Sequence, residues 1–558
     1  MAWATWAAGA AALLLMGAHC AAIYTESLHW DELGLFYRAA ETWRTGVIDA
    51  GGRPGLAAVL PGPLVRGCSD VLAVVHAGRW ATAIATFAYV AGLFMALRSV
   101  LQGLVERPAK SALFGVALLV GVPIFHRWSV QVRSDQWCLA LGLWGAVALI
   151  ASQRKTWLAA IAGVLFGVGY LFTQKVAYVA GLALLLAAAR QQLTGSFSWR
   201  RELARGAWLA AAAAAVIAAF TLWKNARFTP RLGADNFEAA AFYRNMLGYG
   251  PYVRMLDMMI VHLIVVALMV FAFVKRPAPE HRRLLGFAAL AIAMGLGVVV
   301  VHTSAFAYFW MTLGLFPAVA GALALEPIER AFSSRRIASL LTAAMFIALL
   351  AGAVPAIARR AADTQRVQRD AYAFIEASFP REAFGFHPEG GLFCRPDPDP
   401  FRFFFSLQLA YELKAPGAVD RFVQRFVDKP VSFLVATHRL NGFPKPVQRF
   451  WRDHYLLYGP AVMIPGFTLR AETAQTLKVS VIVPGEYRWA PADGAPAIEL
   501  DGAPLKAGGK CWLARGVHEV RATAPFKLGF LALAMASPPR PAGDYYPADM
   551  LREITLRD

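Results

Sequence analysis

The sequence predicts a mainly α-helical polytopic membrane protein that ends in a region outside the membrane with α/β and β-sandwich-like character. Hydrophobic residues make up 58% of the 558 residues, far more than a soluble chain of this length needs. Apolar runs long enough to cross a bilayer recur to about residue 357. Beyond residue 358 the runs stop, and short helix-like and strand-like segments separated by turn residues take their place.

About eleven apolar segments have spanning length, with ends that hydropathy defines only to within a few residues. They fall at about 2–24, 71–97, 111–125, 135–152, 156–172, 175–189, 206–223, 257–274, 284–301, 306–325 and 337–357. The first segment lacks a basic region before it and a good cleavage site after it. We therefore interpret it as a retained helix and not as a signal peptide.

The distribution of Lys and Arg predicts the orientation of these segments. With the N-terminus in the cytoplasm, every inner loop carries at least two basic residues, as in the loops near Arg154 and Arg335. An odd number of spans then leaves the C-terminal region outside. This arrangement predicts a multi-pass membrane protein whose C-terminal region lies outside the cytoplasm. The formal charge of +19 is dispersed over many loops, which argues against a nucleic-acid partner.

We expect three domains, namely a transmembrane domain over 1–360, an α/β module over 361–475 and a β-sandwich-like module over 476–558. The chain has five cysteines, none with zinc-ligand spacing. Cys394 and Cys511 both lie in the C-terminal region, so they could pair there if that region is outside the cytoplasm.

An acidic stretch follows the first apolar segment, where His29 and Trp30 precede Asp31 and Glu32. Charge at the mouth of a membrane helix is costly unless it has a use. Apolar residues then recur at helical spacing up to Gly46, which predicts an amphipathic helix at the interface. Two interpretations remain open from these residues. Asp31 could belong to a functional site, or it could only cap this helix.

Other polar residues fall at predicted outer ends of spans. Asp135, preceded by Arg133, opens the fourth span, where it could cap the helix or act as a second site acid. Lys175 lies in a tight hairpin between the fifth and sixth spans, where it could extend to the membrane surface or meet a phosphate. The outer loops carry many further cations, including Arg53. Lipid headgroups or an anionic ligand would each explain so many outer cations.

Acids and cations on one side of a membrane suit sugar transfer from a lipid phosphate. The glycosyl phosphate leaves as a stabilised anion, so the reaction needs a carboxylate base for the acceptor and cations for the phosphate. The sequence contains no P-loop or GxGxxG segment, and no Ser/His/Asp or HExxH pattern. No cofactor is certain. A divalent metal is possible because three carboxylates face the same compartment, although a base alone would suffice.

The order of these motifs resembles the integral-membrane glycosyltransferases of the C superfamily (GT-C), in particular the lipid A aminoarabinose transferases and protein O-mannosyltransferases. Shared features are Asp31-Glu32 soon after the first span, a basic residue before proline at Arg53-Pro54, an outer Asp at Asp135, and Lys175 after a Gly-rich span. The resemblance implies Asp31, Glu32 and Asp135 as site carboxylates. It also implies Arg53 and Lys175, with Arg133 nearby, as ligands of the lipid phosphate.

These observations and the resemblance together lead us to expect an inverting glycosyltransferase that moves a sugar from a polyprenyl-phosphate donor to an acceptor hydroxyl at the periplasmic face of a bacterial inner membrane. The acceptor could be a glycan, a lipid or a protein. Loop residues that differ from the aminoarabinose enzymes leave the sugar undefined. A different class is a transporter or lipid flippase for an anionic cargo, which predicts interrupted helices and charges deep in the membrane. A third interpretation has the β module binding a glycan while the membrane part anchors it.

Overall fold

The computed structural model describes Gly17 and residues 20–48, 55–230, 259–301, 309–361, 364–395, 413, 415–459, 461–491 and 497–535. The chain forms two compact units. The first unit, here called the membrane unit, comprises Met1–Glu26, Glu41–Pro63 and Val75–Asp363. The second, here called the extramembrane unit, comprises Ser27–Ala40, Leu64–Val74 and Thr364–Asp558. The C-terminal region therefore folds together with two short segments from near the N-terminus.

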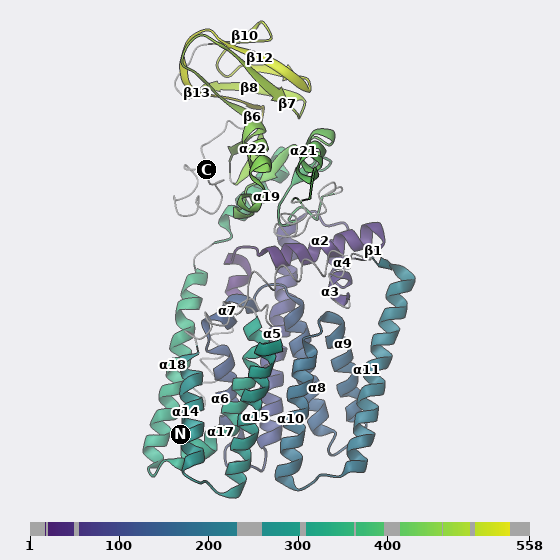
Figure 1. The fold of residues 1–558 in the computed structure, drawn as a ribbon, viewed down its shortest axis with the longest axis vertical. Helices are drawn as coiled ribbons and strands as arrows, with labels where there is room; N and C mark the ends of the chain where they lie inside the picture. The colour runs from purple at the N-terminus through teal and green to yellow at the C-terminus, as the bar shows by residue number, and fades with distance from the viewer. Residues whose placement is uncertain are drawn as a thin grey trace. The chain divides into compact units, whose positions relative to one another are not determined.

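Within the described residues, seven helical segments are long and apolar enough to cross a membrane (Figure 1). The number of candidate spans is eight if a bent pair of helices is counted as one more span. The seven are α5 (Val71–Leu101), α8 (Ser134–Ala151), α10 (Val176–Thr194), α11 (Trp199–Arg227), α15 (Pro279–Val301), α16–α17 (Trp310–Leu313 and Leu315–Ala331) and α18 (Arg335–Ala361). Two further apolar helices, α9 (Leu158–Phe172) and α14 (Ile260–Val274), have 15 residues each. Most of the first predicted segment lies outside the described residues. The chain is thus a multi-pass membrane protein, as predicted.

The bent pair, α6 (Pro108–Val120) and α7 (Pro123–Ser129), turns by 74° within a predicted single span. Pro123 has no N–H to donate to the Leu119 carbonyl, so the helix cannot continue through it. A free carbonyl in an apolar setting costs several kcal/mol. His262 Nε2 lies 2.8 Å from the Leu118 carbonyl oxygen, and Trp310 Nε1 donates to that of Leu119 at 3.5 Å. Neighbouring helices therefore satisfy the carbonyls that the break exposes.

Small residues let α9 and α11 approach closely. A Cβ on Gly163 would stand 2.2 Å from the Leu209 carbonyl oxygen, and one on Gly167 would stand 3.1 Å from that of Ala213. Gly163 and Gly167 are four residues apart and share one face of α9. This is the small-residue spacing by which membrane helices pack, because lipid supplies little hydrophobic force between them.

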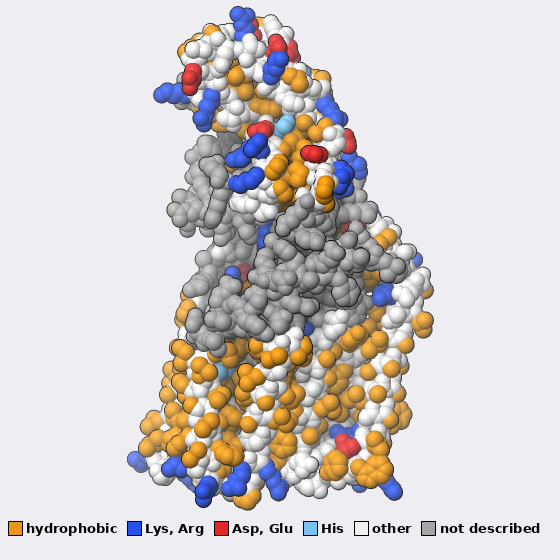
Figure 2. Space-filling model, viewed as in Figure 1, with side chains coloured by type: hydrophobic (Ala, Val, Ile, Leu, Met, Phe, Trp, Pro, Cys, Tyr) orange, Lys and Arg blue, Asp and Glu red, His pale blue; other side chains and the backbone are white. Residues whose placement is uncertain are grey.

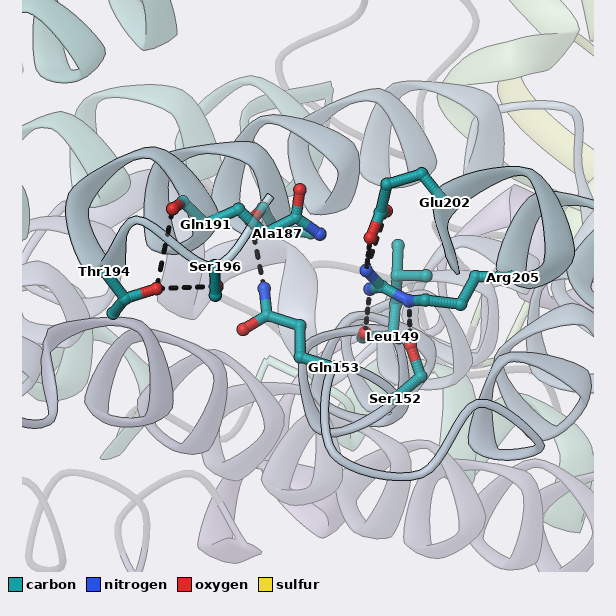
Figure 3. Close-up of polar contacts among 9 residues, drawn as sticks. All are labelled: Leu149, Ser152, Gln153, Ala187, Gln191, Thr194, Ser196, Glu202 and Arg205. Carbon is teal, nitrogen blue, oxygen red and sulfur yellow. Dashed lines mark hydrogen bonds and ion pairs between the residues drawn. The ribbon is translucent and has the colours of Figure 1, made fainter. Parts of the chain in front are cut away.

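An apolar belt covers the visible face of the membrane unit, and Lys and Arg side chains gather at one end of its helices (Figure 2). Near that end, Arg205 of α11 closes the C-terminus of α8 (Figure 3). Its guanidinium donates to the Leu149 carbonyl oxygen at 2.8 Å and to Ser152 Oγ at 2.7 Å, while Glu202 accepts from Nη1. A cation at a helix C-terminus is favourable because it opposes the helix dipole.

Short helices and strands form the first half of the C-terminal region of the extramembrane unit. They are α19 (Arg366–Ser378), β3 (Gly385–Phe386), α21 (Ala418–Asp428), β4 (Phe433–Val435), a 3₁₀ helix (His438–Gly442), α22 (Lys445–His454) and β5 (Tyr455–Tyr458). The following strands are β6 (Val462–Ala471), β7 (Thr476–Val481), β8 (Gly485–Pro491), β9 (Ile498–Leu500), β10 (Ala503–Leu505), β11 (Lys510–Leu513), β12 (Gly516–Ala522) and β13 (Phe526–Leu533).

Two sheets form the β region. One runs in the order β11-β8-β13-β6-β4-β3, with β5 also paired to β6, and the other runs β10-β9-β12-β7. Apolar residues from both sheets, such as Trp489, Leu531, Val479 and Val520, share one buried core, which makes the arrangement sandwich-like. Strand β6 pairs with β4 and β5 as well as with β13, so it belongs to both the α/β part and the sandwich. A helical membrane region followed by a mixed sheet region confirms the predicted fold class.

Candidate functional site

Asp135 and Lys175 meet in the membrane unit. Lys175 Nζ lies 2.8 Å from Asp135 Oδ1, and their side chains are only 14% and 7% exposed. Asp135 occupies the first turn of α8, where the helix dipole favours an anion, and Lys175 directly precedes α10. Lys175 Nζ also lies 5.3 Å from the centre of the Phe309 ring. The sequence singled out both residues, and the structure brings them together as a buried ion pair.

Packing between helices fixes this pair. Cys138, one turn along α8 from Asp135, donates its thiol to the Thr173 carbonyl oxygen at 3.6 Å. Thr173 ends α9 and lies two residues before Lys175. Trp137 stacks on Phe172 with ring centres 6.1 Å apart. The hairpin that carries Lys175 is therefore held against the start of α8.

The pair lies at the helix ends remote from the loops predicted to face the cytoplasm. Asp135 is at the start of α8, and the Arg154–Lys155 loop follows the end of the same helix, after 18 helical residues or about 27 Å. Lys175 stands likewise at the start of α10, whose last turn leads toward Arg200 and Arg201. The acid and the cation thus share the end of the helix bundle that the charge pattern predicts to be the outer one.

Arg133 precedes α8 and is 7% exposed. Its Nε and Nη2 donate to Gln131 Oε1 at 3.2 and 3.0 Å, and its guanidinium carbon lies 4.7 Å from the centre of the Trp128 ring. Gln136 donates to the carbonyl oxygens of Trp128 and Gln131, which holds the loop against α8. Arg133 is therefore a preorganised cation two residues before Asp135.

Asp31 and Glu32 lie in the first turn of α2 (Trp30–Thr45), which Gly46 follows with a positive φ of 71°, as the pattern predicted. Glu32 is fully buried, and its Oε2 accepts from the His29 N–H at 2.9 Å. His29 Nδ1 in turn accepts from the Asp31 N–H at 3.2 Å. The first bond is that of a capping box, and the second caps the helix through the N–H of its second residue, with an imidazole in place of a hydroxyl. The carboxylate that closes this cap is that of Glu32.

The Asp31 carboxylate is 21% exposed, and its Oδ2 lies 3.6 Å from His29 Nδ1. The simple alternative, in which Asp31 serves only as the helix cap, is therefore less favoured, because Glu32 and His29 supply the capping contacts. Asp31 instead stands beside an imidazole on a turn whose backbone the cap has fixed. Sequence reasoning missed this role of His29, because the capping signature has Ser, Thr, Asp or Asn three residues before the Glu and not His.

The start of α2 is anchored inside the extramembrane unit. The Leu28 backbone exchanges two hydrogen bonds with the Gln368 side chain of α19, at 2.5 and 3.1 Å. Phe36 and Phe393 pack with ring centres 5.5 Å apart. The neighbouring residue Cys394 forms a disulfide with Cys68. Asp31 is therefore held by contacts with the C-terminal region as well as by its own helix.

The disulfide answers a question that the sequence left open. Cys394 pairs with Cys68 and not with Cys511, which is a free cysteine. Sequence reasoning compared only the two cysteines of the C-terminal region, whereas the 64–74 segment belongs to the same compact unit. The sulfur of Cys511 instead donates to the Tyr487 carbonyl oxygen across strands β11 and β8.

The remaining predicted site residues fall in different parts of the chain. Arg53 lies outside the described residues, so its predicted role stays a prediction. Asp31 and Glu32 belong to the extramembrane unit, while Asp135, Arg133 and Lys175 belong to the membrane unit. The described part of the chain contains no group of three or more His, Cys, Asp or Glu side chains arranged to hold a metal ion.

A buried polar cluster in the extramembrane unit gave no sequence signal. The rings of Tyr372 and His387 stack, and the Tyr372 hydroxyl donates to the Gly391 carbonyl oxygen at 3.1 Å. The Glu389 N–H donates to His387 Nδ1 at 3.1 Å, and Glu389 Oε1 lies 3.7 Å from Arg439 Nε. Burial raises the pKa of Glu389 to about 7 and lowers that of His387 to about 3. The cluster shares its loop with Cys394 and shapes the segment that carries the disulfide.

Fold and site together define a multi-pass membrane protein with a buried acid–cation pair at one end of its helices and a mixed sheet region after them. Among solved structures, it is similar to the Archaeoglobus fulgidus oligosaccharyltransferase in a complex with Zn and sulfate, with a TM-score of 0.42, 11% identity and coverage of 94% of this chain and 98% of that one. It is also similar to that species' oligosaccharyltransferase AglB in complex with an inhibitory peptide and a dolichol-phosphate, with a TM-score of 0.44, 9% identity and coverage of 95% and 97%. No family model and no curated protein matches the sequence.

Proposed function

We propose that the protein is an inverting glycosyltransferase that takes a sugar from a polyprenyl-phosphate donor and transfers it to an acceptor hydroxyl on the outer, periplasmic side of a bacterial inner membrane. The observation that carries this proposal is the buried Asp135–Lys175 pair at the helix ends remote from the basic loops. Lys175 and the preorganised Arg133 lie at these helix ends and can provide the cations that a lipid phosphate needs. The phosphate would reach them from the outer side, without crossing the bilayer.

In this proposal, Asp31 is the general base. It removes the proton of the acceptor hydroxyl as that oxygen attacks the anomeric carbon, and the bond to the lipid phosphate breaks on the opposite face. Lys175, Arg133 and Arg53 stabilise the departing phosphate, which takes the electron pair. Asp135 orients Lys175, and Glu32 fixes the backbone turn that carries Asp31. The reaction needs no group beyond these side chains.

The disulfide supports the outer location of the extramembrane unit. Disulfides persist in the periplasm and outside the cell, and they are rare in the cytoplasm. Because Cys68 and Cys394 lie in two segments far apart in sequence, one bridge requires both segments to be on the same, oxidising side. The positive-inside distribution of the loops independently gives the same orientation.

The transporter or flippase alternative gains one observation, the broken helix pair α6–α7. Transporters use such breaks to present free backbone groups to a substrate. Here His262 and Trp310 already contact the exposed carbonyl oxygens of Leu118 and Leu119. The break therefore serves helix packing, and the enzyme remains the better-supported class.

The test is sugar transfer by the purified full-length protein in detergent, with a panel of polyprenyl-phosphate sugars and lipid phosphate release as the readout. Asp31→Asn should abolish transfer and hydrolysis of the active donor, whereas Asp453→Asn, which changes an exposed carboxylate on α22, should retain both. Equal turnover by Asp31→Asn and wild type would remove Asp31 from the reaction. Movement of labelled lipid across proteoliposomes without sugar release would instead establish the transporter.

A further inference from the structure

The outer face of the larger sheet carries an exposed tryptophan on its edge strand β11. The Trp512 side chain is 72% exposed, although the adjacent Leu513 is buried in the sandwich core. A single exposed apolar side chain is common on a protein surface, so the case for Trp512 as a contact residue depends on the side chains around it. Trp512 lies opposite Glu486 of β8 in the strand register.

Charged side chains surround Trp512 on the same face. Residues paired across antiparallel strands point to the same side, so Glu486 and Arg488 of β8 share this face with Lys510 and Trp512. Lys510 Nζ lies 2.8 Å from Glu486 Oε2. Two cations and one anion therefore border the indole, and the pair Lys510–Glu486 neutralises only one of the cations.

Arg488 is the cation left over. Among the described residues its buried Nε has no hydrogen-bond partner, and the neighbouring carboxylate of Glu486 is paired with Lys510. It also faces Lys510 directly across the two strands, and two like charges in register destabilise a sheet. An unpaired guanidinium beside an exposed aromatic ring favours a planar anion, because a carboxylate can accept two parallel hydrogen bonds from it.

The face extends beyond β8. Phe530 of β13 is partly buried and stands in register with Ala490 of β8 and with the exposed Thr468 of β6. From β11 to β6 this face spans three inter-strand spacings, or about 14 Å. Such a width suits an extended chain of several rings better than a single small molecule.

We propose that this face, defined by Trp512, Lys510, Glu486 and Arg488, binds an acidic oligosaccharide whose sugar rings carry carboxylates. A sugar ring presents C–H groups on one side, which pack on the indole, and hydroxyls at its edge, which the Lys510–Glu486 pair can meet as donor and acceptor. Arg488 binds the carboxylate. This inference does not depend on the proposed enzymatic function, because it concerns binding by a separate surface.

Isothermal titration of the full-length protein in detergent with a galacturonate hexamer tests the proposal, with a neutral galactose hexamer as the comparison ligand. We expect the acidic hexamer to bind and Trp512→Ala and Arg488→Gln each to weaken binding at least tenfold. Val517→Ala removes a similarly exposed apolar side chain (66%) from the other sheet and should leave affinity unchanged.

Three results would overturn the proposal. Binding of the acidic hexamer that Trp512→Ala does not weaken would remove the indole from the site. Equal affinity for the neutral hexamer would exclude recognition of the carboxylate. Absence of heat from the wild-type protein at millimolar hexamer would show that this face binds no acidic glycan of this kind. Thermal unfolding of each variant should match wild type, because the substituted side chains contribute little to the core.

Discussion

Cys68 and Cys394 are 326 residues apart in sequence, yet they form a disulfide within one compact unit. One segment follows the amphipathic helix α2 and its loop, and the other follows the buried cluster around Glu389. Phe36 of α2 packs on Phe393, the neighbour of Cys394. The bridge therefore joins the surroundings of Asp31 to the C-terminal region.

Removal of this disulfide should destabilise the protein by about 2–4 kcal/mol, since a bridge across a long loop restricts the unfolded chain. The variants are Cys68→Ser and Cys394→Ser, measured by thermal unfolding in detergent. Cys511→Ser is the matched control and should unfold as wild type does, because Cys511 has no disulfide partner. Mass spectrometry after alkylation without reductant should find two protected cysteines, and five modified ones would contradict the bridge.

Glu32 and Asp31 should respond differently to substitution. Glu32→Gln keeps an oxygen acceptor for the His29 N–H and should retain stability, whereas Glu32→Ala should lose about 1 kcal/mol, as loss of a helix cap does. Asp31→Asn should retain wild-type stability and lose sugar transfer. Thermal unfolding measured beside lipid phosphate release separates the two roles. A large loss of stability in Asp31→Asn would assign that residue to the helix cap instead.

Much of the architecture could be predicted because it depends on local patterns. The short strand-like segments expected beyond residue 358 are present, for example as β9 and β12. The helix from Asp31 to Gly46 likewise follows from its spacing and its terminal glycine. The break at Pro123 was missed because the surrounding run is uniformly apolar, although proline gave a usable signal.

The contacts between distant residues could not be predicted from those patterns. Asp135 and Lys175 each stood out as polar residues at a span end, but nothing in their spacing showed that they pair. The Cys68–Cys394 bridge was missed because it joins a short N-terminal segment to a region that composition alone treats as separate. Both depend on how helices and segments pack, which local hydropathy does not specify.

Lys175→Ala should affect folding as well as ligand binding. It leaves the buried Asp135 carboxylate without its cation, and breaking a buried pair costs on the order of 3–5 kcal/mol. Lys175→Met combined with Asp135→Asn removes both charges and should recover most of that stability. Thermal unfolding of Lys175→Met, Asp135→Asn and the double variant gives the coupling between the two residues. If the single variant is as stable as wild type, the pair is not formed in the protein.

The double variant then tests the phosphate role. Once the buried charge no longer disturbs folding, a loss of affinity for polyprenyl phosphate reports on the cation itself. We expect at least a tenfold weaker affinity in a detergent binding assay, because a charge-assisted contact to phosphate is lost. Lys155→Met, which removes a lysine from a predicted inner loop, is the matched control and should bind as wild type does.

The buried pair His387 and Glu389 should give the extramembrane unit an unusual pH response. The pKa of His387 is lowered from 6.5 to about 3, so below pH 6.5 this residue binds a proton in the unfolded chain but not in the native one. His387 therefore lowers stability as the pH falls. Burial raises the pKa of Glu389 from 4.5 to about 7, and Arg439 opposes this shift. Below pH 7 this residue binds a proton in the native chain but not in the unfolded one, so it raises stability as the pH falls. Between pH 6.5 and 4.5 these two effects cancel.

Substitution of either residue should expose the effect of the other. In Glu389→Gln, stability relative to wild type should fall as the pH falls from 6.5 toward 4.5, by about 1.4 kcal/mol per pH unit, because only His387 then resists protonation. In His387→Asn, stability should instead rise as the pH falls from 7 toward 4.5, because only Glu389 then gains its proton on folding. Unfolding temperatures of the full-length variants across this range provide the measurement. Parallel curves for both variants and wild type would show that neither group is buried as described.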